Sequence, residues 1–133
     1  MLRLIPKLFA AGLFCCCLIS IVQAQDEGKA LTVALEEGSS QEIVNYLDDR
    51  VEISFNNDKR DFSKSQAQIV LRDFFRNHPS KGFQLQQEGK SSATLSYLIG
   101  TYRSSEGDFR LLIRGIKRND KPFLIYSMDF IRH

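Results

Sequence analysis

Few side chains in this sequence could carry out chemistry, and they stand far apart along the chain. The two histidines are His78, beside Pro79 at the end of a predicted helix, and His133, at the end of the sequence. Isolated histidines without a second ligand nearby make a poor metal site, and His78 is better explained as a cap of its helix. The sequence also lacks a Gly-x-Ser-x-Gly turn for a serine nucleophile and a Gly-rich phosphate loop. We therefore expect no catalytic residue, no cofactor and no metal ion.

Tyrosines supply most of the side chains that could line a small-molecule pocket. The candidate lining residues are Tyr97, Tyr102, Tyr126 and Met128. Tyr126 is expected to face inward beside Met128, as a core ring with a tethered hydroxyl group rather than as an acid. The carboxylate Asp129 is expected on the opposite side of its strand, where it forms a cross-strand ion pair with Arg110. Paired carboxylates on a sheet surface are usually structural, so the pattern favours a core over a catalytic centre.

A group of basic side chains surrounds the last predicted turn of the chain. Its members are Arg114, Lys117, Arg118 and Lys121. Such a group could bind an anion, but lysine and arginine at the margin of a sheet more often prevent strands of different molecules from pairing. We interpret the group as a solvated margin, with anion binding as the alternative.

The elements that must position these residues begin with two helices. The first is predicted over residues 26–37, and Gly38 is suited to end it. Its apolar stripe consists of Leu31, Ala34 and Leu35. The second helix is short and opens with a capping box formed by Ser39 and Glu42. A half-buried strand follows, in which polar residues separate Val51, Ile53 and Phe55.

The polar stretch over residues 57–61 comes next and carries several side-chain oxygens. It lacks the glycine and the terminal glutamate of a calcium loop, so we interpret it as a polar turn. Ser63 and Gln66 then open the most regular helix with a second capping box. Its apolar positions, at i, i+3, i+4, i+7 and i+8, are Ala67, Val70, Leu71, Phe74 and Phe75. The helix is expected to stop before Pro79.

Four strands with short connections are predicted in the second half, which gives an antiparallel meander and an α+β fold. The first runs from Phe83 to about Gly89, and the others cover residues 93–103, 108–118 and 123–132. If Asn119 and Asp120 form a two-residue turn, one core face pairs Phe109, Leu111 and Ile113 with Phe130, Met128 and Tyr126. The opposite face then carries four apolar residues that we regard as interface candidates: Leu112, Ile116, Phe123 and Ile125.

The first residues have the three parts of a secretory signal. Arg3 and Lys7 precede an uncharged apolar run from Leu8 to Val22, and Ala24 then offers a small residue for cleavage before Gln25. The run is shorter than the about 20 apolar residues that a membrane span needs. We predict a signal peptide over residues 1–24, one domain over residues 25–133, and export to the periplasm or the medium.

Removal of this segment changes the chemistry of the chain. All three cysteines lie in the apolar run, at Cys15, Cys16 and Cys17, so the remaining chain contains no thiol. Lipid attachment at Cys16 is the less favoured alternative, because bulky residues precede this cysteine and it lies inside the run. Without Arg3 and Lys7, the remaining basic residues equal the 16 acidic ones in number. A neutral chain favours neither nucleic acid nor an anionic membrane as a partner.

The order of helix, helix, strand, long helix and meander resembles the nuclear transport factor 2-like fold, the cystatin-like cone of ketosteroid isomerases and polyketide cyclases. More closely, the chain is similar to a family of small exported bacterial proteins of that fold, described as a domain of unknown function. The matching stretches are Val51–Phe55, Phe62–Ala67, Asp73–Pro79 and Gly100–Tyr102. The resemblance implies a curved sheet around the long helix, often paired through its outer face, and implies no known reaction.

We therefore predict a non-catalytic exported domain that binds a protein partner, itself as a homodimer, or a small apolar ligand. The alternative is a small-molecule isomerase, dehydratase or cyclase with a pocket between helices and sheet. Such an enzyme would need an open cone with a carboxylate base inside it.

Overall fold

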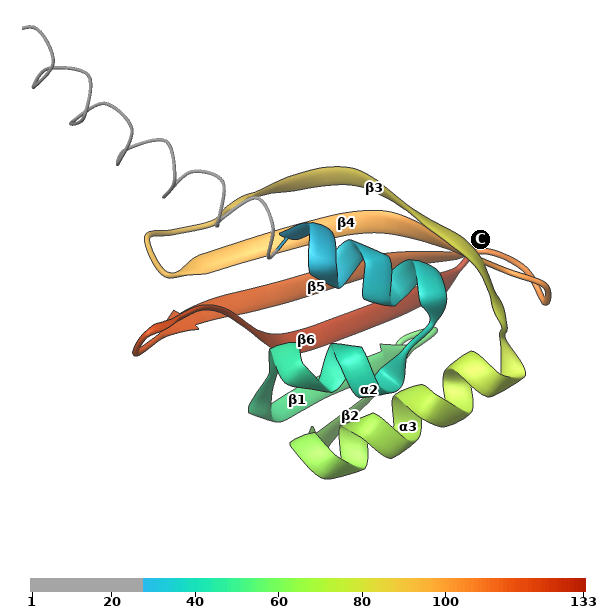
Figure 1. Cartoon of the computed structure of the whole chain (residues 1–133), viewed down its shortest axis with the longest axis horizontal. Helices are drawn as coiled ribbons and strands as arrows, with labels where there is room; N and C mark the ends of the chain where they lie inside the picture. The colour runs from blue at the N-terminus through green and yellow to red at the C-terminus, as the bar shows by residue number, and fades with distance from the viewer. Residues whose placement is uncertain (1–27) are drawn as a thin grey trace, which may run out of the picture. The chain divides into compact units, whose positions relative to one another are not determined.

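The strands of the computed structural model form one curved sheet, and the helices pack against one of its faces (Figure 1). The structure describes residues 28–133, of which Leu31–His133 form a compact unit. The predictions for residues 1–24, including cleavage between Ala24 and Gln25 and the lipid alternative at Cys16, lie outside the described residues. Within the described residues, no helix is long and apolar enough to cross a membrane.

The described part of the chain contains six strands, which lie in the order β2-β1-β6-β5-β4-β3. Their bounds are β1 (Leu47–Phe55), β2 (Asp58–Ser63), β3 (Ser80–Lys90), β4 (Leu95–Ser104), β5 (Phe109–Arg118) and β6 (Lys121–Arg132). Neighbouring strands are antiparallel, except that β1 and β6 are parallel. The predicted meander of β3 to β6 is confirmed, although β3 begins earlier than expected, at Ser80. The β1–β2 hairpin extends the sheet beyond β6.

The helices begin and end where local side chains and backbone conformation dictate. Residues 28–37 are helical, and Gly38 follows with a φ of 63°, which glycine adopts at little cost. The short helix α2 (Ser40–Ile43) starts where the Ser39 Oγ accepts a hydrogen bond from the Glu42 N–H, and a 3-10 turn (Val44–Tyr46) continues it. The long helix α3 (Lys64–Asn77) opens with both hydrogen bonds of the predicted Ser63–Gln66 capping box.

The core lies between these helices and the inner face of the sheet. The predicted helix stripes are confirmed, because the helical side chains of this core are Leu31, Ala34, Leu35, Ile43, Ala67, Leu71, Phe74 and Phe75. From β5 and β6 it receives mainly Phe109, Leu111, Ile113, Ile125, Met128 and Phe130. Burial along β5 alternates from Phe109 to Ile116, so the less buried side chains of this stretch lie on the opposite, outer face of the sheet.

The polar stretch after β1 is a strand, which corrects the prediction of a turn over residues 57–61. Asn56 and Asn57 have φ values of 51° and 71° and form a two-residue turn that places Asp58 opposite Phe55. Two consecutive left-handed residues give the turn geometry that suits the twist of a hairpin, and asparagine tolerates this conformation. Because β2 is an exposed strand at the edge of the sheet, it contains few apolar residues, and no apolar alternation in the sequence predicted it.

The β5–β6 hairpin keeps the predicted turn but not the predicted register. Arg118 pairs with Lys121 across the two-residue turn, and two irregularities then shift the pairing along the strands. As a result, Ile113 lies opposite Met128 instead of Tyr126. The irregularities lie between Ile116 and Arg118 and between Arg114 and Gly115, and each moves the pairing by one residue. From Arg114 toward Phe109, the two shifts cancel, and the paired β6 residues lie on the faces that the sequence predicted. Between the two irregularities only one shift applies, so the β6 residues there lie on the face opposite to the predicted one.

Candidate functional site

The four candidate pocket residues do not come together in one site. Tyr102 and Met128 are fully buried in the core. Tyr97 lies on the outer face, where its hydroxyl oxygen accepts a hydrogen bond from the Gln87 Nε2 at 3.1 Å. Tyr126 is half-buried and is not among the core side chains, so it lacks the expected place beside Met128. The cause is the irregular register near Gly115, which places Tyr126 outside the regular pairing.

Tyr102 is a structural tyrosine that ties the sheet to the end of α3. Its hydroxyl group donates a hydrogen bond to the carbonyl oxygen of His78 at 2.7 Å. Burial raises the pKa of the Tyr102 phenol above its ordinary value of 10.0, and the Ser80 hydroxyl opposes this with a smaller lowering effect. A buried phenol that prefers to stay protonated and is already bonded to a carbonyl suits a core position.

His78 caps α3 as predicted. Its backbone N–H and its Nδ1 both lie within hydrogen-bond distance of the Phe74 carbonyl oxygen, at 2.8 and 3.1 Å. Its ring stacks on the Phe74 ring with a centroid distance of 4.6 Å. The other ring nitrogen, Nε2, lies 3.5 Å from the Arg132 Nη2. His78 therefore has a structural role: it caps the helix and packs on the Phe74 ring.

Aromatic rings fill the cone in the described part of the chain. The Phe74 ring is the centre of this cluster, with centroids 5.0 Å from Phe55, 5.2 Å from Phe109 and 4.6 Å from Phe130. Tyr102 adds a further ring at 5.8 Å. These rings pack against one another between α3 and the inner face of the sheet.

A carboxylate near the core is already paired. Asp48 is buried, and its two carboxylate oxygens lie 3.2 Å from the Arg118 Nη1. Asp48 also accepts a hydrogen bond from the Asp49 N–H at 2.8 Å. This ion pair joins β1 to the end of β5, so it uses one member of the basic group around the last turn. No local pattern along the chain predicts this pair, because its partners are 70 residues apart.

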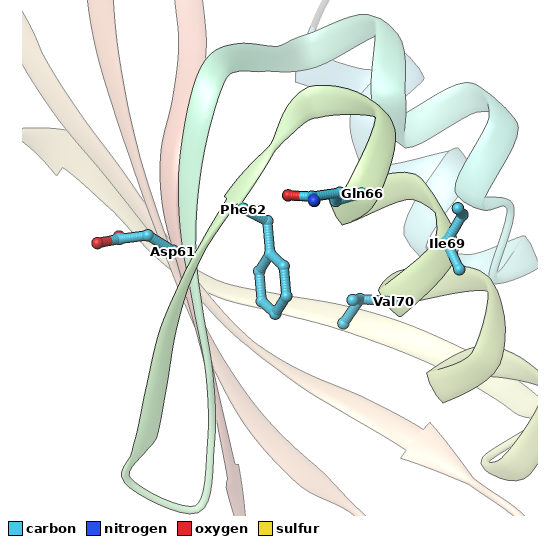
Figure 2. A pocket seen from close by; sticks show the side chains of 5 residues that line it. All are labelled: Asp61, Phe62, Gln66, Ile69 and Val70. Carbon is cyan, nitrogen blue, oxygen red and sulfur yellow. The ribbon is translucent and has the colours of Figure 1, made fainter.

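A hollow of about 380 Å³ lies between β2 and α3 (Figure 2). Phe62 and Val70 point into it, and Gln66 and Ile69 complete its helical wall. The side chain of Asp61 points to the other side of β2 in this view. Asp61 and Gln66 are the polar residues among those that line the hollow, and the Asp61 carboxylate does not point into it in this view.

The outer face of the sheet is the more distinctive surface. Its β5 positions are Arg110, Leu112, Arg114 and Ile116, and the paired positions of β4 are Leu95, Tyr97, Ile99 and Thr101. The apolar members on β4 and β5 are partly exposed. On β6, Ile131 is 38% exposed opposite Arg110, whereas Leu124, opposite Ile116, is buried. Within the described residues, no helix packs over this face.

Two of the four interface candidates lie on this outer face, Leu112 and Ile116. Ile125 is fully buried in the core, and Phe123 packs against the core, so their predicted position on the outer face is wrong. The register shifts move both inward and bring Leu124 outward. The Phe123 ring lies in the space that a side chain at position 115 would occupy.

The space beside Gly115 explains why Phe123 turns inward. A Cβ atom at this position would lie 1.9 Å from the Phe123 Cε2, so only glycine lets the ring occupy this place. The absence of a side chain at Gly115 thus allows the Phe123 ring to lie on the inner face. The alternation of apolar residues in the sequence does not predict this position.

Polar atoms without partners lie beside the apolar part of the outer face. Asp129 faces Leu112 across the strands, and the predicted ion pair with Arg110 is wrong because of the shifted register. On its other side Asp129 pairs with Ser54 of β1. The Asp129 Oδ1 and the Ser54 Oγ are buried and have no hydrogen-bond partner in the described structure. Native proteins rarely leave such atoms unpaired, which makes this the leading candidate site.

The remaining basic residues stay at the margin of the sheet. Lys117 and Lys121 are exposed near the turn, and Arg114 projects from the outer face. Among the ion pairs of residues 28–133, this group contributes Arg118, which is paired with Asp48. Among the residues that the structure describes, no three His, Cys, Asp or Glu side chains are placed to hold a metal ion.

Sequence comparison agrees with the described fold. The profile of the family described as "Domain of unknown function (DUF4783)" matches residues 29–130. The chain belongs to the DUF4783 family. The resemblance stated from the sequence is therefore confirmed for the family. A search of curated proteins found no match.

Solved structures similar to the chain include other DUF4783 proteins. One from Bacteroides uniformis is 27% identical, with a TM-score of 0.75 over 79% of this chain and 95% of that one. One from Bacteroides fragilis is 28% identical, with a TM-score of 0.73 over 78% and 96% of the two chains. An NTF-2 like protein of unknown function from Burkholderia xenovorans shares 12% identity, with a TM-score of 0.60 over 82% and 83%. The nuclear transport factor 2-like fold is thereby confirmed.

Proposed function

We propose that this DUF4783 protein is a non-catalytic binding domain and that it pairs with a second copy of itself through the outer face of its sheet. The observation that carries this proposal is the band of partly exposed apolar side chains across β4, β5 and β6, on a face without a covering helix in the described structure. Removing such side chains from water contributes about 25 cal/mol per Å² of apolar surface, from which the cost of ordering the two chains is subtracted. Export of the domain remains a proposal from the sequence of its first 24 residues.

The composition of the outer face supports a second copy as the partner. The face carries a carboxylate, Asp129, as well as two arginines, Arg110 and Arg114, around the central Leu112. A surface that contains both signs of charge around an apolar centre is complementary to itself when a two-fold axis relates the copies. The aromatic rings that fill the cone support binding rather than catalysis, because they occupy the place of a substrate.

Sedimentation equilibrium of the purified protein tests this proposal. We expect a dimer in the micromolar range, and Leu112→Lys should raise its Kd at least about tenfold, since it places an unpaired cation in the centre of the interface. Ile69→Lys is the matched control: Ile69 is 50% exposed on α3, away from the outer face, and the same change of charge should leave the Kd unaltered.

A wild-type protein that stays monomeric at high micromolar concentration would contradict the proposal. An effect of Ile69→Lys as large as that of Leu112→Lys would also contradict it. In that case the hollow between β2 and α3, which Ile69 lines, would be the contact surface instead.

A further inference from the structure

Arg110 and Arg114 stand symmetrically about Leu112 on the outer face. All three belong to β5, and each arginine lies two residues from Leu112, which places the three side chains on the same face. Both arginines are exposed, whereas Leu112 is partly exposed. Neither arginine belongs to an ion pair among residues 28–133. The single chain therefore leaves both guanidinium groups without a carboxylate partner.

None of the four residues directly opposite the two arginines is a carboxylate. They are Tyr97 and Ser127, on either side of Arg114, and Thr101 and Ile131, on either side of Arg110. The Tyr97 hydroxyl oxygen accepts a hydrogen bond from the Gln87 Nε2, which leaves the hydroxyl proton available to an acceptor. Guanidinium N–H groups beside hydroxyl groups are the kind of donors that bind an oxyanion.

The carboxylate near this group, Asp129, does not balance the two cations. It lies opposite Leu112 on β6 and is therefore diagonal to both arginines. The residue is half-buried, and its Oδ1 is fully buried. Even with its full negative charge counted, Asp129 offsets one of the two positive charges. Each outer face thus keeps a surplus of positive charge around Leu112.

A dimer centred on Leu112 brings the arginines of one copy onto those of the other. In a two-fold contact between two such faces, the same surface meets itself and the axis lies in the plane of contact. An axis along β5 makes each residue of the strand face itself, and an axis across β5 makes Arg110 face Arg114 of the second copy. Both axes keep the strands of the two sheets aligned, which is a usual mode of sheet packing. In either case guanidinium groups meet guanidinium groups, and such like-charge contacts oppose association.

We infer that, in the proposed dimer, β5 arginines of the two copies share a small free oxyanion of the phosphate or sulfate kind. The inference rests on the proposed function and adds a ligand that controls it. The planar fork of a guanidinium group matches two oxygens of such an anion, and one anion can accept hydrogen bonds from an arginine of each copy. The anion is a free ion rather than a lipid headgroup, because each contact is enclosed between two protein faces.

Sedimentation equilibrium in two buffers of equal ionic strength tests this inference. One buffer contains chloride as its anion, and in the other a few millimolar inorganic phosphate replaces part of the chloride. Equal ionic strength keeps the general screening of charges the same. We expect phosphate to lower the dimer Kd of the wild type at least about tenfold, because it replaces a like-charge contact by two charge-assisted ones.

The double variant Arg110→Gln/Arg114→Gln removes both cations and keeps long polar side chains. Its Kd in chloride should lie about threefold or more below that of the wild type, since the like charges are gone, and phosphate should leave this Kd unchanged. Arg72→Gln/Arg76→Gln is the matched control, because it removes two exposed arginines of α3, which packs on the inner face. This control should keep the full response to phosphate. It also accounts for the general strengthening of apolar burial by phosphate, which acts on every variant alike.

Several outcomes overturn the inference while the proposed function stands. One is a wild-type dimer with the same Kd in both buffers, and another is a Kd in chloride that rises in the Arg110→Gln/Arg114→Gln variant. A wild type that stays monomeric in both buffers overturns the inference and the proposed function together.

Native mass spectrometry and a vesicle assay identify where the anion binds and from which source it comes. Phosphate that remains bound to the dimer but not to the monomer supports the inference, whereas equal retention by both means an adventitious ion only and overturns it. Vesicles that contain phosphatidic acid should bind the protein no better than neutral vesicles. Stronger binding to the phosphatidic acid vesicles that the Arg110→Gln/Arg114→Gln variant loses would assign the arginines to a lipid surface and overturn the inference.

Discussion

Tyr102 illustrates how single residues in this protein serve packing rather than chemistry. Its ring lies in the aromatic cluster around Phe74, and its hydroxyl group donates a hydrogen bond to the His78 carbonyl oxygen. The bond holds β4 to the point where α3 ends. Because burial raises the pKa of this phenol, its contribution to stability depends on pH in a defined direction.

Tyr102→Phe should lower the free energy of unfolding at neutral pH by about 1 kcal/mol, the usual net value of such a hydrogen bond. A raised folded-state pKa gives stability that is complete below the unfolded-state pKa of about 10 and is lost as the pH rises through the folded value. The difference between wild type and variant should therefore narrow above about pH 10. Urea denaturation at a series of pH values measures it, and a difference that stays constant would contradict the assignment.

At the scale of secondary-structure elements, the β1–β2 hairpin depends on the conformation of two residues. Its turn rests on two consecutive left-handed asparagines, Asn56 and Asn57. The Asn56 Oδ1 also accepts a hydrogen bond from the Arg132 N–H at 2.8 Å, which fastens the turn to the end of β6. With the described residues the Asn57 side chain forms no such hydrogen bond, so a substitution at Asn57 tests the backbone conformation of the turn by itself.

Asn57→Ala should destabilise the protein by about 1–2 kcal/mol, because a Cβ-bearing residue without a short polar side chain is strained in the left-handed conformation. Asn57→Gly is the matched control, and it should be neutral or slightly stabilising, since asparagine–glycine is a preferred pair for this turn. Chemical denaturation of the two variants gives the comparison. Equal stability of both variants would show that the turn adopts another conformation.

Elements with a strong local signal were predictable from the sequence, whereas the edges and irregularities of the sheet were not. Helix α3 carries a capping box and a regular apolar spacing, and both are present in the structure. Strand β2 is exposed along most of its length, so no apolar alternation marked it. In β6, the core place expected for Tyr126 belongs to Ile125 because of register shifts that depend on the space beside Gly115. The candidate site at Ser54 and Asp129 follows from strand order, which alternation along single strands does not reveal.

At the scale of the whole molecule, Phe74 holds the layers together. Its ring, on α3, contacts rings from β1, β4, β5 and β6: Phe55, Tyr102, Phe109 and Phe130. The cone is therefore a packed interior with an aromatic centre. A packed interior responds to truncation differently from an open pocket, because the surrounding side chains collapse only in part.

Phe74→Ala should reduce the free energy of unfolding by about 3–5 kcal/mol. Ile69→Ala, on the same helix but 50% exposed, provides the matched control and should change it by less than about 1 kcal/mol. Thermal and chemical denaturation measure both. A loss below about 1 kcal/mol for Phe74→Ala would mean that the ring lines an open space, which would favour the enzyme alternative.

The parallel pairing of β1 with β6 also constrains the time course of folding. The β1–β2 hairpin can form early from neighbouring residues, as can the β3–β4 and β4–β5 pairs. It cannot join the meander until β6, the last strand along the chain, is in place between β1 and β5. Contacts between segments so distant in sequence slow folding, because a long loop must close before they form. Until that step, the apolar inner face of the sheet stays divided, and the chain is most exposed to aggregation.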